Sequence, residues 1–170
     1  MKMRSRQLPD APDFAKGFIG IVFRAKPDGS EFESYYVRPA NGNHADPVRR
    51  VHGSQYFSYP GYTFAYFREF GIEGYEAPVN IQLDEWITLK AVIIDKKASF
   101  FVNDMEHPIL RVEDLKHGPM HTEQSASMSI RERKRFSRIG RSHVFRVLGI
   151  EFFGCLFIRR GNRNGFVADR

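Results

Sequence analysis

A chain of 170 residues, 42% hydrophobic and 14% aromatic, can bury the core of one globular domain, which excludes a disordered or collagen-like protein. No apolar run approaches the ~18 residues of a membrane span, so we expect no transmembrane helix. The single Cys155 excludes an internal disulfide and disfavours a cysteine-based zinc site. We interpret Cys155 as a small core residue.

The net charge of +6 is unevenly distributed along the chain. Residues 119–170 carry eleven Lys or Arg and four acidic residues, whereas residues 1–118 carry fifteen and sixteen, so the two segments have net charges of +7 and −1. A basic composition indicates partners only for the segment that carries it, and we expect no nucleic-acid partner for the body of the domain. The basic run 131–141 could contact phosphate, but we interpret it as solvated or disordered.

The N-terminal part of the chain predicts short strands joined by turns. Residues 1–16 contain prolines and alternating charges, which indicates a loop or a frayed strand. Residues 17–25 are apolar on both faces, as in a central strand. The turn residues 26–29 then lead into a second strand over 31–38, so the two strands form a β-hairpin.

A polar loop, PANGNHADPVRRVHGS, follows at residues 39–54. It is long for a compact domain, and long ordered loops are often functional. Residues 55–59 predict another short strand, and the aromatic-rich residues 62–70 predict a further one. A turn over 71–74 closes this part of the chain.

Residues 85–103 predict the central β-hairpin, with its turn at the charged residues 95–97. Side-chain alternation places two apolar stripes on this hairpin, and we expect Trp86 and Phe100 in the core. Residues 108–115 predict a last short strand. Many short strands separated by turns, with no long helical period before Pro119, indicate an all-β protein with two packed sheets.

Three sequence blocks resemble a known family. They are YVRPANG with the following RRVH and QY, then YEAPVNIQLDEWITLKAVIIDKKASFFVN, and finally PILRVEDLKHG. Together they are similar to bacterial, mostly uncharacterised members of the concanavalin A-like lectin/glucanase superfamily, of the laminin-G or jelly-roll kind, over roughly residues 14–118. The resemblance implies a two-sheet antiparallel jelly-roll sandwich. It also implies a secreted or periplasmic protein, although the first residues lack the apolar stretch of a signal peptide.

Two departures from the family divide the chain into a domain at 14–118 and an atypical tail at 119–170. Family members have another strand before residues 17–25, and an IGLW-like strand and a Gly-rich turn after LKHG. Nothing similar follows Gly118, where strand alternation also ends. A frameshift would explain these features, because codons for IRERKRF can read YGNGSVF one base on. The alternative is a genuine basic extension that docks on the sheet through residues 144–158.

The best candidate binding residues are the polar and aromatic side chains in and around the 39–54 loop. They are Tyr36, Arg38, Asn41, Asn43, Arg50, His52, Gln55 and Tyr56. Arg, Asn, Gln and His can hydrogen-bond sugar hydroxyls, while Tyr36 or Tyr56 offers a ring for stacking on a pyranose. The alternative is that Arg38 and Arg50 pair with acidic residues and brace the loop.

Catalytic and metal-binding signals are weak. Laminarinase-type relatives carry E-x-D-x-E on one strand, and this motif is absent. Glu31 and Glu33 have suitable spacing, but we interpret them as exposed strand acids. Two loop pairs, His44 with Asp46 and Asp104 with Glu106, could ligate Ca²⁺, yet such spacing is common without a metal, and we expect no cofactor and no catalytic residue.

The expected function is therefore carbohydrate or glycan binding by a lectin-like module without catalysis. This function is implied by the family resemblance more than by any motif. One alternative is a glycoside hydrolase of the related jelly-roll keto-disaccharide hydrolase type. Another is a structural interaction domain.

Overall fold

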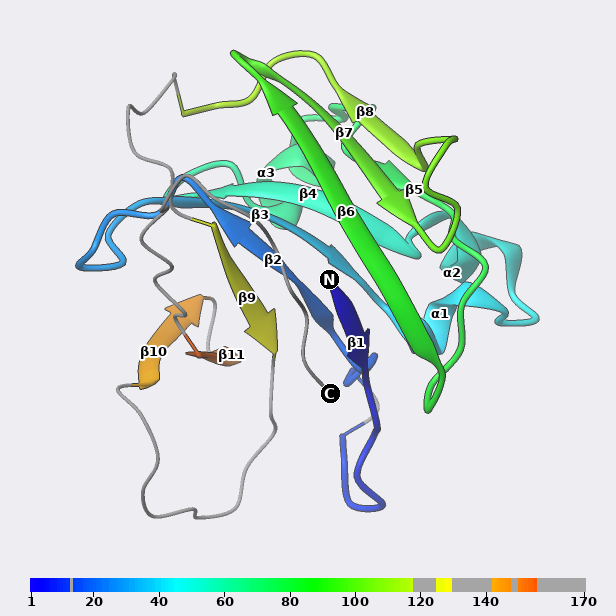
Figure 1. The fold of residues 1–170 in the computed structure, drawn as a ribbon. Helices are drawn as coiled ribbons and strands as arrows, with labels where there is room; N and C mark the ends of the chain where they lie inside the picture. Colours follow the sequence, from blue (N-terminus) through cyan, green and yellow to red (C-terminus); the bar gives the residue numbers. More distant parts are fainter. Residues whose placement is uncertain (13, 118–124, 130–141, 148–149, 156–170) are drawn as a thin grey trace, which may run out of the picture.

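The computed structural model describes residues 1–12, 14–117, 125–129, 142–147 and 150–155, and in them two antiparallel sheets dominate (Figure 1). The four-stranded sheet has the order β1-β6-β7-β8, and the five-stranded sheet has the order β5-β4-β3-β2-β9. The bounds are β1 Lys2–Arg4, β2 Ile19–Phe23, β3 Phe32–Val37, β4 Ser54–Tyr59, β5 Glu76–Ala77, β6 Trp86–Ile94, β7 Lys97–Val102, β8 Leu110–Val112 and β9 Ser125–Ser129. The two-sheet, all-β prediction is confirmed.

Among the described residues, three short helices accompany the sheets. They are α1 (Pro39–Gly42), α2 (Pro47–Val51) and α3 (Phe64–Glu69). A separate hairpin joins β10 (Ser142–Val147) and β11 (Ile150–Cys155). Among the residues described, no helix combines the length and the apolar composition that crossing a bilayer requires.

The five-stranded sheet buries one of its faces against the four-stranded sheet. Antiparallel pairing sets Tyr35 opposite Tyr56, and the Tyr35 ring stacks on Phe100 of β7 with a centroid distance of 4.3 Å. These aromatic residues belong to the main core. Alternation sends Tyr36 and Phe57 to the opposite face, which we call the outer face, where they join a second apolar cluster.

The central hairpin β6–β7 forms as predicted, with a shorter turn. Lys97 already belongs to β7, and Asp95 adopts a left-handed backbone with φ +50°. Phe100 is fully buried, as expected. The prediction for Trp86 is wrong: its side chain is 66% exposed, because Ile87 is the neighbour that points to the other sheet.

A strand was expected over residues 62–70, but Phe64–Glu69 within this segment form the helix α3. Phe67 turns inward at 2% exposure, and its ring stacks on Tyr75 with centroids 4.1 Å apart. Burial of this one helical face outweighs the β-propensity of the aromatic residues. The loop 39–54 also contains two helical turns, and Asp46 caps α2 by accepting a hydrogen bond from the Val48 amide.

Two strands, β1 and β9, lie in segments for which the sequence did not clearly predict a strand. β1 pairs with β6 at the edge of the four-stranded sheet, so part of the expected N-terminal loop is strand. β9 pairs with β2, with Ser127 opposite Ile21, although no strand was expected after Gly118. The domain boundary at 118/119 stays a prediction. The basic run 131–141 and the side chain of Cys155 lie outside the described part of the structure.

Candidate functional site

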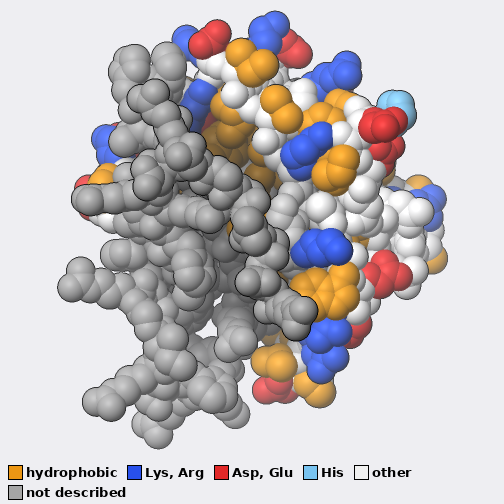
Figure 2. Space-filling model, in the orientation of Figure 1, with side chains coloured by type: hydrophobic (Ala, Val, Ile, Leu, Met, Phe, Trp, Pro, Cys, Tyr) orange, Lys and Arg blue, Asp and Glu red, His pale blue; other side chains and the backbone are white. Residues whose placement is uncertain are grey.

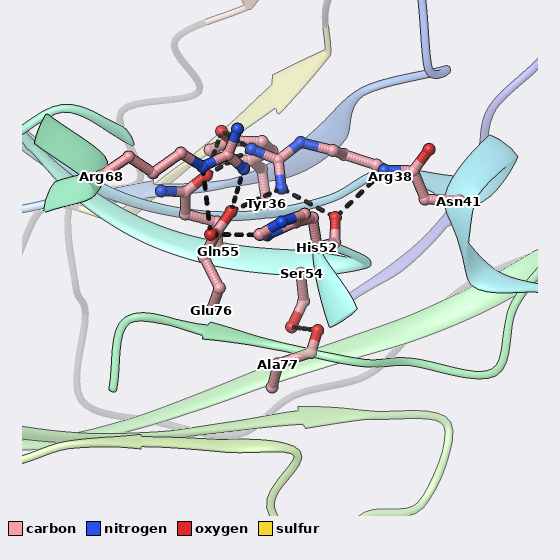
Figure 3. Close-up of polar contacts among 9 residues, drawn as sticks. All are labelled: Tyr36, Arg38, Asn41, His52, Ser54, Gln55, Arg68, Glu76 and Ala77. Atoms are coloured by element: carbon pink, nitrogen blue, oxygen red, sulfur yellow. Dashed lines mark hydrogen bonds and ion pairs between the residues drawn. The ribbon is translucent and has the colours of Figure 1, made fainter. Parts of the chain in front are cut away.

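Arg38 is the buried centre of a polar network on the outer face of the five-stranded sheet (Figure 3). It follows β3 directly and is only 6% exposed. Its Nη2 donates to Tyr36 Oη at 2.7 Å and to Gln55 Oε1. Its Nη1 donates to the His52 carbonyl oxygen at 2.8 Å and to Glu76 Oε1 at 3.1 Å. One guanidinium therefore fixes the positions of four acceptors from β3, β4, β5 and the loop.

Glu76 extends this network toward solvent. Its pairing with Gln55 places it on the outer face of the sheet. Glu76 Oε1 accepts a second hydrogen bond from Arg68 Nη2 at 2.7 Å, while Oε2 lies 2.8 Å from His52 Nδ1. We call Tyr36, Arg38, His52, Gln55, Arg68 and Glu76 the Arg38 cluster.

Exposure within the cluster rises from the inside outward. The side chains of Arg38, Glu76, His52 and Arg68 are 7%, 18%, 33% and 45% exposed. An incoming ligand would therefore meet His52 and Arg68 first. Because His52 Nδ1 faces Glu76, its Nε2 is the ring nitrogen left for a ligand.

The positively charged side chains of the cluster stabilise the ionised form of Glu76. Burial on its own would raise the pKa of Glu76, but the hydrogen bond from Arg68 and the charges of Arg38, Arg68 and His52 outweigh it, so this pKa lies below its ordinary value. Burial raises the pKa of Tyr36 more than the nearby Arg38 charge lowers it. Tyr36 is thus a neutral hydroxyl that donates to Gln55 Oε1 at 2.9 Å.

Gln55 leaves one hydrogen-bonding group unused. The residue is fully buried, and its Oε1 accepts from both Arg38 and Tyr36. Its Nε2 has no hydrogen-bond partner. An unpaired buried donor typically costs ~1–3 kcal/mol. Beside it, the half-buried Phe18 ring lies 5.7 Å from the Tyr36 ring and forms an apolar wall.

The structure brings five of the eight predicted site residues together. Tyr36, Arg38, His52 and Gln55 belong to the Arg38 cluster. Asn41 joins it through its Nδ2, which donates to the His52 carbonyl oxygen at 3.3 Å. These five residues come together because they lie on the paired strands β3 and β4 or in the segment that connects them.

The other three residues lie apart. Asn43 is exposed at the end of α1. Arg50 donates to the carbonyl oxygens of His44 and Ala45 at 2.8 and 3.1 Å, so it braces the loop. Tyr56 is fully buried and points between the two sheets. Since Tyr36 is also buried, neither predicted tyrosine presents an open ring face for stacking.

Sequence reasoning missed Glu76, Arg68 and Phe18. Glu76 lies in a two-residue strand, and Arg68 in the helix that was expected to be a strand. Their proximity to Arg38 arises only from the fold. Phe18 had a usable signal, because alternation places it on the same face as Val22, which the structure assigns to the outer face.

Glu31 and Glu33 were both interpreted as exposed strand acids, and this interpretation is wrong for Glu33. Glu33 is fully buried on the inner face of the sheet, where Arg24 Nη1 lies 3.2 Å from Oε2 and Tyr56 Oη lies 2.6 Å from Oε1. Glu31 is partly exposed and pairs with Lys26 at 2.5 Å.

The two candidate calcium pairs form local turns. Asp46 caps α2, and Asp104 Oδ1 accepts hydrogen bonds from the amides of Glu106 and His107 at 2.7 and 3.1 Å. The hydrogen bond from the Glu106 amide, followed by those with the side chain and the amide of His107, holds the pKa of Asp104 at about 2. Among the described side chains, no three His, Cys, Asp or Glu residues gather closely enough to hold a metal ion.

Comparison with known proteins leaves the chain without an assigned relative. No family model matches it, and no curated protein and no solved structure matches it significantly. The likeness to concanavalin A-like proteins therefore rests on the three sequence blocks alone.

Proposed function

We propose that this chain is a non-catalytic carbohydrate-binding module with a concanavalin A-like jelly-roll fold, and that glycan binds at the Arg38 cluster. The observation that carries the proposal is the graded exposure of this cluster. A buried Arg38 holds Glu76 in place, and Glu76 in turn orients the more exposed His52 and Arg68. A few fixed polar groups beside an apolar wall are typical of small-molecule sites.

Preorganisation supports binding at this position. Arg38 and Glu76 are held by charge-assisted hydrogen bonds within the protein, so a ligand does not have to order them. Sugar hydroxyls both donate and accept, which suits the mixed set of Glu76 oxygens, the His52 ring and the Arg68 guanidinium. The unpaired Gln55 amide is buried, so it would become a donor to the ligand only if the neighbouring side chains rearranged on binding.

The positions of the carboxylates favour binding over hydrolysis. Glycosidases use two carboxyl groups roughly 5–10 Å apart across the scissile bond. Glu33 and Glu76 lie on opposite faces of the five-stranded sheet. Glu76 is held ionised by its cationic neighbours, which opposes a role as a general acid.

Calorimetric titration of the full chain with an oligosaccharide panel, neutral and uronic-acid-containing, tests the proposal. Saturable heat without release of reducing sugar is the expected result. Release of reducing sugar would replace the proposal with the hydrolase alternative. Absence of heat with every member of the panel would favour a structural interaction domain.

A further inference from the structure

The outward face of the four-stranded sheet combines cations with exposed apolar side chains. We call it the basic–apolar face, and its principal residues are Lys2, Arg4, Trp86, Val92, Ile94 and Arg111. Antiparallel register places Arg4 beside Trp86, and it aligns Val92, Ser99 and Arg111 in one row across three strands. Figure 2 shows hydrophobic and Lys or Arg side chains interspersed over this side of the molecule.

The strands of this face carry charge of one sign. The strands β1, β6, β7 and β8 contain five Lys or Arg residues and no Asp or Glu. Lys97 is neutralised by Glu113 at 2.6 Å, and Lys90 lies over the Phe101 ring at 3.8 Å. Lys2 and Arg111 are exposed and form no ion pair with any residue that the structure describes.

The apolar residues of this face are exposed to solvent. Trp86, Val92 and Ile94 are 66%, 42% and 67% exposed. The Arg4 guanidinium lies 5.3 Å from the centre of the Trp86 ring, so a cation and an interfacial aromatic residue are presented together. All three apolar residues come from the single strand β6.

We propose that the basic–apolar face docks on an anionic phospholipid surface. Lys and Arg side chains are attracted to acidic headgroups, and Trp and aliphatic side chains enter the boundary between headgroups and acyl chains. The aliphatic Val92 and Ile94 would add little to recognition of a sugar polymer or nucleic acid, which favours lipid as the occupant. The face belongs to the opposite sheet from the Arg38 cluster, so lipid and glycan would bind independently.

The intrinsic fluorescence of Trp86 provides a local readout, because the chain contains one Trp. The full chain is mixed with vesicles of phosphatidylcholine alone or of phosphatidylcholine with phosphatidylglycerol. The expected result is a blue shift and flotation with the mixed vesicles only, both reversed by added salt. Equal binding to the neutral vesicles, or no binding to either, would overturn the proposal.

Neutralising variants locate the contact. Arg111→Gln should weaken vesicle binding about fivefold, and Lys2→Gln with Arg111→Gln about 25-fold, from about 1 kcal/mol per charge. Arg50→Gln is the matched control, since Arg50 is exposed on α2, outside the four-stranded sheet, and should bind as the parent does.

Two further outcomes would also contradict the proposal. Residues 119–170 carry a net charge of +7 and could themselves attract anionic vesicles. In that case Arg111→Gln would bind normally and Trp86 emission would stay unchanged. Binding to heparin or to an acidic protein without binding to mixed vesicles would show that the partner is a polyanion and not a lipid.

Discussion

Tyr56 Oη donates a 2.6 Å hydrogen bond to Glu33 Oε1 between the two sheets. The His117 amide donates to the same carboxylate oxygen at 3.1 Å, and the Lys116 amide donates to Tyr56 Oη at 3.0 Å. Burial, followed by the Glu33 charge, raises the pKa of Tyr56 far above its ordinary value, so it remains a donor. The buried pair thus holds the end of the described domain segment against the five-stranded sheet.

We predict that Glu33→Gln lowers the free energy of unfolding by about 3–5 kcal/mol, because it leaves Arg24, whose side chain is 10% exposed, without its charge partner. Glu31→Gln is the control. Its ion pair with Lys26 is well exposed to solvent and should be worth at most about 1 kcal/mol. Urea denaturation measures both variants, and equal losses would contradict a structural role for Glu33.

Truncation of Phe100 should destabilise the protein far more than truncation of Trp86. Phe100→Ala removes a fully buried ring stacked on Tyr35 and should cost about 3–5 kcal/mol. Trp86→Ala removes an exposed ring whose contact with Arg4 is worth at most about 1 kcal/mol. Thermal unfolding of the two variants provides the comparison, and a large loss for Trp86→Ala would place it in the core after all.

The difference between these two residues shows what strand alternation predicts. Alternation assigned Trp86 and Ile87 to opposite faces, and the structure agrees. It could not tell which face meets the other sheet, because Trp86, Val92 and Ile94 make the outward face of β6 apolar as well. Only the approach of the second sheet distinguishes the two faces.

The candidate site was predictable where its residues are close in sequence. Arg38 and His52 flank one loop, and Gln55 lies just beyond it in β4. Glu76 and Arg68 reach the same point through a short strand and a helix that have no periodic signal of sufficient length. Aromatic residues between 62 and 70 favour a strand by propensity, and burial of Phe67 and the stacking on Tyr75 override that preference.

Glu76 should make the free energy of unfolding decrease at acidic pH. Because its pKa is lowered in the folded state, its contribution is complete above the ordinary value of 4.5 and is lost as pH falls through the lower folded pKa. Glu76→Gln should therefore be less stable than the parent by about 1–3 kcal/mol at neutral pH, since Arg38 loses a charged partner. Urea midpoints from pH 7 to strong acid should show this difference shrinking below 4.5. A constant difference would contradict the ionised carboxylate.

His52 and Asn43 offer a matched test of the carbohydrate site. Both were predicted as ligand contacts, but only His52 belongs to the Arg38 cluster. His52→Ala should weaken oligosaccharide binding about tenfold, which corresponds to one hydrogen bond, whereas Asn43→Ala should leave it unchanged. Calorimetry measures both affinities, and circular dichroism controls for folding. Equal effects of the two substitutions would move the site away from the cluster.

The edge strand β9 allows a test of where the domain ends. β9 pairs with β2 from Ile19↔Ser129 to Phe23↔Ser125, so a chain cut after residue 118 would expose one edge of β2. Unpaired edges lose hydrogen-bond protection and promote association. We therefore expect the truncated chain to show faster amide exchange in β2 and a greater tendency to aggregate than the full chain. If amide exchange and solubility are the same in both chains, residues 119–170 are foreign to the sandwich, as the frameshift interpretation requires. The nucleotide sequence would then encode an IGLW-like strand in another frame.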